Sequence, residues 1–157
     1  MTVIYLETQI HAPIGICFDL SLSIELHMLS TETTGERAIA GRTSGLIGLH
    51  ETVTWRAKHF GIWQKLTVKI TSLERPYSFT DEMLKGAFKS MKHTHTFTEK
   101  LYGTLMNDEF AFESPLGVLG KFADWLILEK YMTRLLKERN RVLKDVAESG
   151  KWQKILK

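Results

Sequence analysis

Cysteine is nearly absent from this sequence, since Cys17 is the only one among 157 residues. A single cysteine excludes an intrachain disulfide and a cysteine-based zinc cluster, and it favours a cytoplasmic setting. Cys17 lies in an apolar stretch beside Phe18, which is typical of a small core residue and not of a nucleophile.

Long apolar segments are also missing. The first ten residues, "MTVIYLETQI", lack the basic start and the uninterrupted apolar stretch of a signal peptide. No other window is long and apolar enough to span a bilayer. The sequence therefore predicts a cytoplasmic protein without integral membrane contact.

The net charge is small, at +3, but it is unevenly distributed. Residues 121–157 carry ten Lys or Arg and five Asp or Glu, whereas residues 1–120 carry eleven against thirteen. Such a basic segment could attract nucleic acid or an anionic membrane surface. Because its charges are spread out and mixed with acids, a solvated helix face is the favoured interpretation, and no nucleic-acid partner is expected.

The sequence also lacks a nucleophile elbow, a phosphate-binding glycine loop and a cofactor fingerprint. No cofactor is therefore predicted. With 43% hydrophobic and 25% charged residues, the composition is that of one soluble globular domain, here residues 1–157.

The pattern of apolar residues predicts a strand over 2–10, then two short helices, one starting after Pro13 and one over about 24–29. Six further strands are predicted at about 36–42, 48–60, 62–73, 77–84, 87–99 and 102–113. Turn residues separate them at spacings that indicate an antiparallel meander.

The last part of the chain predicts one long amphipathic helix over about 115–149. Ser114 suits an N-cap and Pro115 the first helical position, and apolar residues then recur at helical spacing as far as Val146. Gly150 is a natural terminator.

These elements predict an α+β helix-grip fold, in which a curved antiparallel sheet of about seven strands wraps around the long C-terminal helix. A sheet with one hydrophobic face must cover that face, and the last helix is the only long element that can do so. A strongly bent sheet leaves a space too wide to fill everywhere with side chains, so a ligand cavity is expected.

The same order of elements is also found in a known protein superfamily. Together with the stretches "FTDEM", "GAF", "HTHTF", "GTLMND" and "PLGVLG", it resembles the START/polyketide-cyclase-like (SRPBCC) superfamily, and within it the bacterial cell-division-inhibitor-like branch. The motifs cover about residues 50–120 and the element order covers the whole chain. The resemblance implies a helix-grip fold, while function is only weakly implied because the superfamily holds carriers, receptors, cyclases and many binders.

Side chains alternate between the two faces of a strand, so the residues that face the helix can be predicted. The apolar walls of the cavity are expected to be Trp55, Phe79, Met83, Met91, Phe97, Met106, Phe110, Phe122 and Trp125. The polar members of the inward-facing sets are Glu51, Asp81, His93, His95 and Asp108.

An unpaired charge inside a protein costs several kcal/mol, so these polar residues are expected to pair with one another or to reach a cavity. A structural cluster, a lining that orients the head group of a ligand, and general acid/base chemistry all remain open. The spacing of His93 and His95 would allow a shared metal, but two histidines are a weak signal and no metal is predicted.

The sequence therefore predicts binding of a small hydrophobic or lipid-like molecule, more in keeping with a binder than with an enzyme. One alternative is a cyclase or dehydratase-like enzyme with His93 or His95 as base and Asp108 orienting it. Another is a non-catalytic interaction protein in cell division or stress response. A homodimer is compatible with the sequence.

Overall fold

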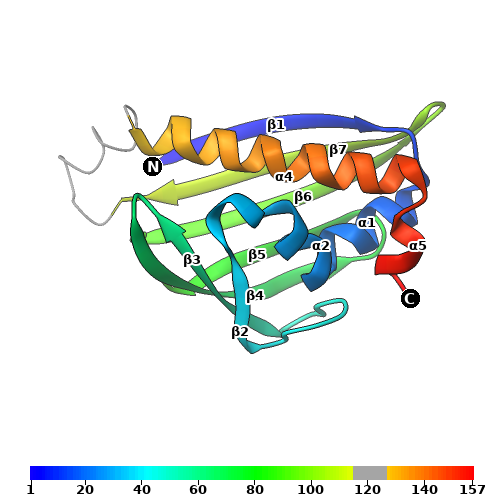
Figure 1. Ribbon diagram of the computed structural model, residues 1–157. Coiled ribbons are helices and arrows are strands. Elements are labelled where there is room, and N and C mark those ends of the chain that lie inside the picture. Colours follow the sequence, from blue (N-terminus) through cyan, green and yellow to red (C-terminus); the bar gives the residue numbers. More distant parts are fainter. Residues whose placement is uncertain (115–126) are drawn as a thin grey trace.

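The structure is a computed structural model that describes residues 1–114 and 127–157. Figure 1 shows one curved antiparallel sheet of seven strands that wraps around a long C-terminal helix. The strand order is β1-β7-β6-β5-β4-β3-β2, so each strand after β2 pairs with the one before it and β1 adds to β7. The predicted α+β helix-grip fold is confirmed.

The strands and helices follow the predicted order. They are β1 (Thr2–Ile10), α1 (Ile14–Leu22), α2 (Ile24–Ser30), the 3-10 turn η1 (Glu32–Thr34), β2 (Arg37–Gly41), β3 (Thr52–His59), β4 (Ile62–Glu74), β5 (Ser78–Lys85), β6 (Ser90–Lys100), β7 (Gly103–Glu113), α4 (Glu129–Ser149) and α5 (Trp152–Ile155). The strand predicted over 48–60 is shorter than expected, because a turn in which Glu51 N–H donates to the Gly48 carbonyl precedes it.

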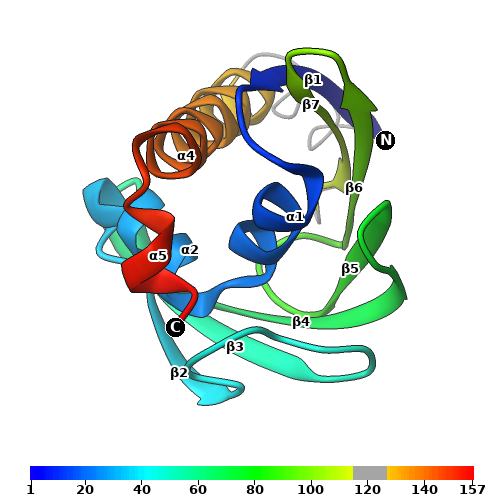
Figure 2. The same ribbon diagram turned by 90° about the vertical axis from the view of Figure 1, so that its right-hand side faces the viewer.

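The two short helices fill one end of the concave face of the sheet, as the end-on view in Figure 2 shows. α1 buries Phe18 completely, with its ring edge-on to Phe79 and Phe97 at centroid distances of 5.6 and 5.4 Å. An extended Ser23 separates α1 from α2, and its Oγ caps α2 by accepting from Leu26 N–H at 3.1 Å. This packing leaves the rest of the concave face to be covered by α4, which contacts the sheet at its edge strand β1.

The described part of the C-terminal helix, α4, buries Leu136, Leu143 and Val146 on one face. Gly150 ends it in the left-handed conformation (φ 81°), as predicted. The predicted start of the helix, at Ser114 and Pro115, concerns residues 115–126, which lie outside the described residues. Among the helices described, none is long and apolar enough to cross a membrane.

The exposed face of α4 carries much of the basic charge of the C-terminal segment. Arg141 pairs with both Glu138 and Asp145, and Lys144 pairs with Glu148. Exposed ion pairs of this kind are typical of a solvated helix face, and they contribute little to the free energy of unfolding.

Two glycines offer a matched test of the close packing where β1 meets β7. A Cβ at Gly103 (φ 144°) would lie 2.4 Å from the Ile10 carbonyl oxygen, whereas a Cβ at Gly61 (φ 76°) would meet no heavy atom within 4 Å. Gly61→Ala should therefore cost only backbone strain, about 1 kcal/mol of unfolding free energy. Gly103→Ala should cost at least about 2 kcal/mol more, because backbone must move. Urea denaturation measures both, and equal losses would contradict the close approach.

Candidate functional site

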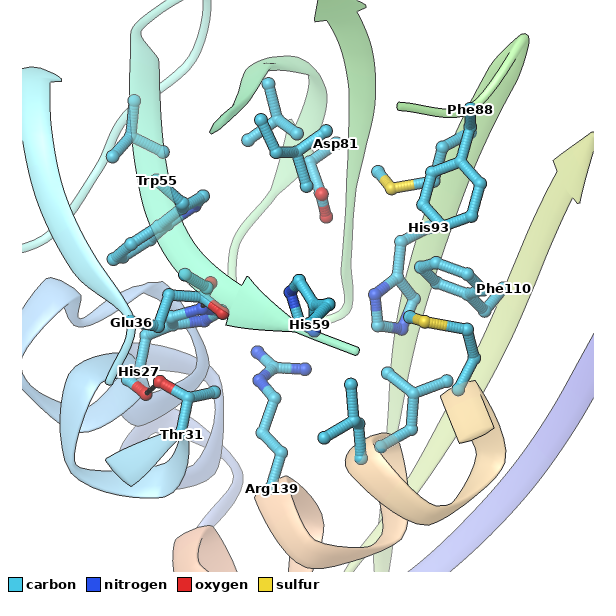
Figure 3. Close-up of a pocket in the computed structure, with 18 of the residues that line it drawn as sticks. His27, Thr31, Glu36, Trp55, His59, Asp81, Phe88, His93, Phe110 and Arg139 are labelled. Carbon is cyan, nitrogen blue, oxygen red and sulfur yellow. Dashed lines mark hydrogen bonds and ion pairs between the residues drawn. The ribbon is translucent and has the colours of Figure 1, made fainter. Parts of the chain in front are cut away.

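A cavity of about 340 Å³ lies between the concave face of the sheet and α4. Its wall is mainly apolar and comes from α2, from strands β3 to β7 and from α4. Representative lining residues are Val53, Trp55, Val68, Met91, Phe110 and Leu136. Figure 3 shows several polar side chains that point into the same space from opposite walls.

The first polar group, which we call the His–Asp cluster, consists of Asp81, His93, His95, Asp108 and Asn140. The strand register assembles its core: Asp81 on β5 lies opposite His93 on β6, and Asp108 on β7 lies opposite His95. The side-chain hydrogen bonds, however, do not join the residues that lie directly opposite each other. His93 Nε2 lies 2.8 Å from Asp108 Oδ1, and His95 Nε2 lies 3.3 Å from Asp81 Oδ1. The expected pairing of histidine with carboxylate is thus confirmed.

Asp108 is the buried centre of this cluster, with 3% of its surface exposed. Its Oδ2 accepts from Asn140 Nδ2 at 2.7 Å, which ties β7 to α4. His95 Nδ1 lies 3.0 Å from Asp108 Oδ1 without the alignment of a hydrogen bond, so that contact is electrostatic. A carboxylate held by three neighbours orients the two histidines.

The two histidines of the cluster respond differently to burial. Burial and the neighbouring His95 lower the pKa of His93 from 6.5 to about 4, although Asp108 favours the charged form. Burial also acts to lower the pKa of His95, but Asp108 and Asp81 outweigh it and raise that pKa. The histidine contacts hold the pKa of Asp108 well below its usual value, against the effect of burial. His93 is therefore neutral at neutral pH.

The second polar group, which we call the Glu36 cluster, lies across the cavity. His27 Nε2 lies 2.6 Å from Glu36 Oε1, and the His27 ring stacks on Trp55 at a centroid distance of 3.9 Å. His59 Nδ1 lies 2.6 Å from the Tyr131 hydroxyl of α4. Contact with His27 holds the pKa of Glu36 below its usual value although burial opposes this.

A metal could be considered at Asp81, His93 and His95, because their ligand atoms all lie within 4.8 Å of one another. Two histidines and a carboxylate suit several divalent transition metals. However, one nitrogen of each histidine is already engaged with a carboxylate. The three groups belong to a hydrogen-bonded cluster, and the second ring nitrogen of each histidine is not used in these two contacts.

Seven of the predicted site residues line the cavity. They are Trp55, Phe79, Asp81, Met91, His93, His95 and Phe110. Phe97 and Met106 are instead completely buried in the core, and Met83 packs against that core without lining the cavity. Asp108 lies behind the two histidines, and Phe122 and Trp125 lie outside the described residues.

The prediction that Glu51 faces the cavity is wrong. Its side chain is 41% exposed and its Oε1 accepts from Arg42 Nη2 at 3.1 Å and from Gly48 N–H at 2.7 Å. The residue precedes β3 in a turn, so the alternation of the strand does not extend to it.

Two buried polar residues of α4, Arg139 and Asn140, were not predicted. They follow Leu136 by three and four positions and precede Leu143, which is the spacing of one helix face. That signal was available in the sequence. Glu36 and Tyr131 had no comparable signal, because their place at the cavity depends on how distant segments pack.

The pKa of His93 makes stability depend on pH. Between about pH 4.5 and 6.5 the unfolded chain binds a proton at this position and the folded chain does not, so unfolding becomes easier as pH falls. His95, with its raised pKa, is protonated in both states there, and the lowered pKa values of Asp81, Asp108 and Glu36 act mainly below this window. Burial also lowers the pKa of His59, which acts in the same direction but equally in the wild type and in a His93 variant.

We expect the wild type to lose up to roughly 2–3 kcal/mol of unfolding free energy between pH 6.5 and 4.5 through His93. His93→Gln, which cannot titrate, should lose clearly less over the same window. Urea denaturation at several pH values measures this difference, and identical pH slopes would show that His93 is not buried in its neutral form.

This chain resembles known proteins in structure but not detectably in sequence. No protein-family profile matches the chain, and no curated protein is detectably similar in sequence. Solved structures do match. A START superfamily protein from Mycobacterium smegmatis is 11% identical, with a TM-score of 0.70 over 92% of this chain and 96% of that one.

Two further structures agree. Major latex-like protein 151 from Panax ginseng is 16% identical, with a TM-score of 0.69 over 93% of this chain and 97% of that one. A Thermus thermophilus protein is 18% identical, with a TM-score of 0.71 over 90% and 97% of the two chains. Likeness at these identities concerns architecture. The resemblance noted in the sequence is confirmed for the fold, which is the START-like helix-grip fold.

Proposed function

We propose that this protein binds a small, mainly apolar molecule in the cavity between the sheet and α4. The observation that carries the proposal is the hollow itself, about 340 Å³ with a largely apolar wall. Protein interiors are normally close-packed, so an apolar space of this size is kept at a cost in packing. The START-like fold supports the same role by analogy.

The polar side chains in the cavity would orient the ligand. Asp81, His93 and His95 lie on one wall, and His27, Glu36 and His59 lie on another. A ligand with an apolar body and one polar group would bury the body against Trp55 and its neighbours and present the polar group to these walls. Such a binder would act in the cytoplasm, as the single cysteine favours.

A second candidate function has one specific observation in its favour. His93 faces the cavity, stays neutral through burial, and is oriented by Asp108, which Asn140 holds in turn. A neutral imidazole held by a carboxylate can accept a proton from a bound substrate. The arrangement would suit a cyclase or dehydratase, in which the same cavity first binds its substrate.

A space-filling substitution tests the binding function. Ala57 on β3 lines the cavity, whereas Ala111 on β7 alternates with the buried Phe110 and Phe112 and points to the other face of the sheet. Ala57→Phe should displace any ligand, while Ala111→Phe should leave it in place. Native mass spectrometry of each protein purified from cells reports the bound molecule.

We expect an additional mass on the wild type and on Ala111→Phe, and its loss from Ala57→Phe. Circular dichroism confirms that both variants are folded. A wild type that carries no small molecule and takes up none from a cell lipid extract would contradict the proposed function.

A further inference from the structure

Arg139 is the one basic residue of α4 that the helix buries. Only 8% of its surface is exposed, and its side chain lines the cavity, unlike the exposed Arg141 on the opposite face. In Figure 3 the guanidinium extends from α4 into the space between Glu36, His59 and His93. A permanent positive charge therefore sits inside a mainly apolar cavity.

This charge has no paired acid in the part of the chain that the structure describes. Among the residues that the structure describes, Arg139 forms no ion pair, and its one hydrogen bond runs from Nη2 to the Ser21 carbonyl at 3.5 Å, a long distance. Its Nε is buried without any partner in the described part of the chain. An arginine offers five N–H donors, and the described residues accept from only one of its nitrogens, Nη2.

The described carboxylates around the cavity are each bound to another group. Glu36 contacts His27 at 2.6 Å, and Asp81 contacts His95 at 3.3 Å. Asp108 is held by His93 and by Asn140 on α4. The charge of Arg139 helps to lower the pKa of both Glu36 and Asp81, so its field reaches both walls although it touches neither acid.

A buried charge without a partner costs several kcal/mol, and a guanidinium fork matches a carboxylate in shape and charge. We infer that the ligand is a small apolar acid whose single carboxylate binds Arg139 while its apolar part fills the cavity. This inference rests on the proposed function and names the class of ligand. A phosphate is disfavoured because its second charge would face Glu36 and Asp81.

A matched ligand series tests the inference. Decanoic acid, decan-1-ol, methyl decanoate and decylamine share one apolar chain and differ at one end. Titration calorimetry, or the change in tryptophan fluorescence to which Trp55 in the cavity contributes, gives the four dissociation constants at pH 7.5. We expect the acid to bind at least about tenfold more tightly than the alcohol, the ester and the amine.

The variants assign that preference to one side chain. In Arg139→Met, the dissociation constant of the acid should lie within about threefold of that of the alcohol. The dissociation constant of the alcohol itself should be nearly unchanged. Arg134→Met, at an exposed position of the same helix, should keep the full preference. Arg139→Lys retains the charge without the fork and should give an intermediate preference.

If Arg139→Met does not fold, the ionisation state of decanoic acid bound to the wild type tests the inference. Burial in an apolar cavity raises the pKa of a carboxylic acid, whereas a neighbouring guanidinium lowers it. The carbon-13 signal of carboxyl-labelled decanoic acid bound at pH 6 should therefore show the ionised form. A protonated signal would overturn the inference.

The outcomes separate the two proposals. Equal binding of the four compounds, tighter binding of the amine, or an acid preference that survives in Arg139→Met would overturn the acid ligand while leaving the binding function in place. Failure of every compound to bind, together with an absence of any co-purifying molecule, would count against both.

Discussion

One constraint governs this structure: a single helix must cover the concave face of a seven-stranded sheet. The described part of α4 packs against β1 and against α1 and α2, so it lies close to one edge of the sheet. α1 fills one end of the concave face with Phe18. The space in front of β3 to β6 is left over, and it forms the cavity. The hollow follows from the architecture and not from any one small residue.

The same constraint decides which polar groups can be buried. Side chains that point from the sheet into the hollow need partners, and the register of β5, β6 and β7 supplies them by placing Asp81 and Asp108 on either side of the two histidines. α4 adds Asn140 to that arrangement. Arg139 enters the hollow from the same helix turn, and no acid of residues 1–114 or 127–157 pairs with it, which is the feature that the apolar acid would complete.

Much of this could be predicted from the sequence, because it depends on local periodicity. The alternation along β6 correctly placed Met91, His93, His95 and Phe97 on the buried face. The alternation failed at Glu51, where a turn interrupts the strand. The period of α4 placed Arg139 and Asn140 on its buried face, but apolar residues alone were used to define that face.

The remaining features depend on packing between distant segments. Glu36 meets His27 because β2 lies beside α2, and Tyr131 meets His59 because the first turn of α4 lies near the end of β3. No spacing within one element encodes these contacts. The same limit applies to the size of the cavity. That size is the volume that the curved sheet encloses, less the volume that the side chains of α1, α2 and α4 fill.

The central claim is that a ligand lies in the cavity with its acid group on Arg139. A crystal structure of the complex with 10-bromodecanoic acid tests it most directly, because the anomalous signal of bromine locates the far end of the chain independently of the protein atoms. We predict one bromine peak within the apolar wall that includes Trp55, and carboxylate density on the guanidinium of Arg139. A bromine peak on the outer surface, or a carboxylate that avoids Arg139, would contradict the claim.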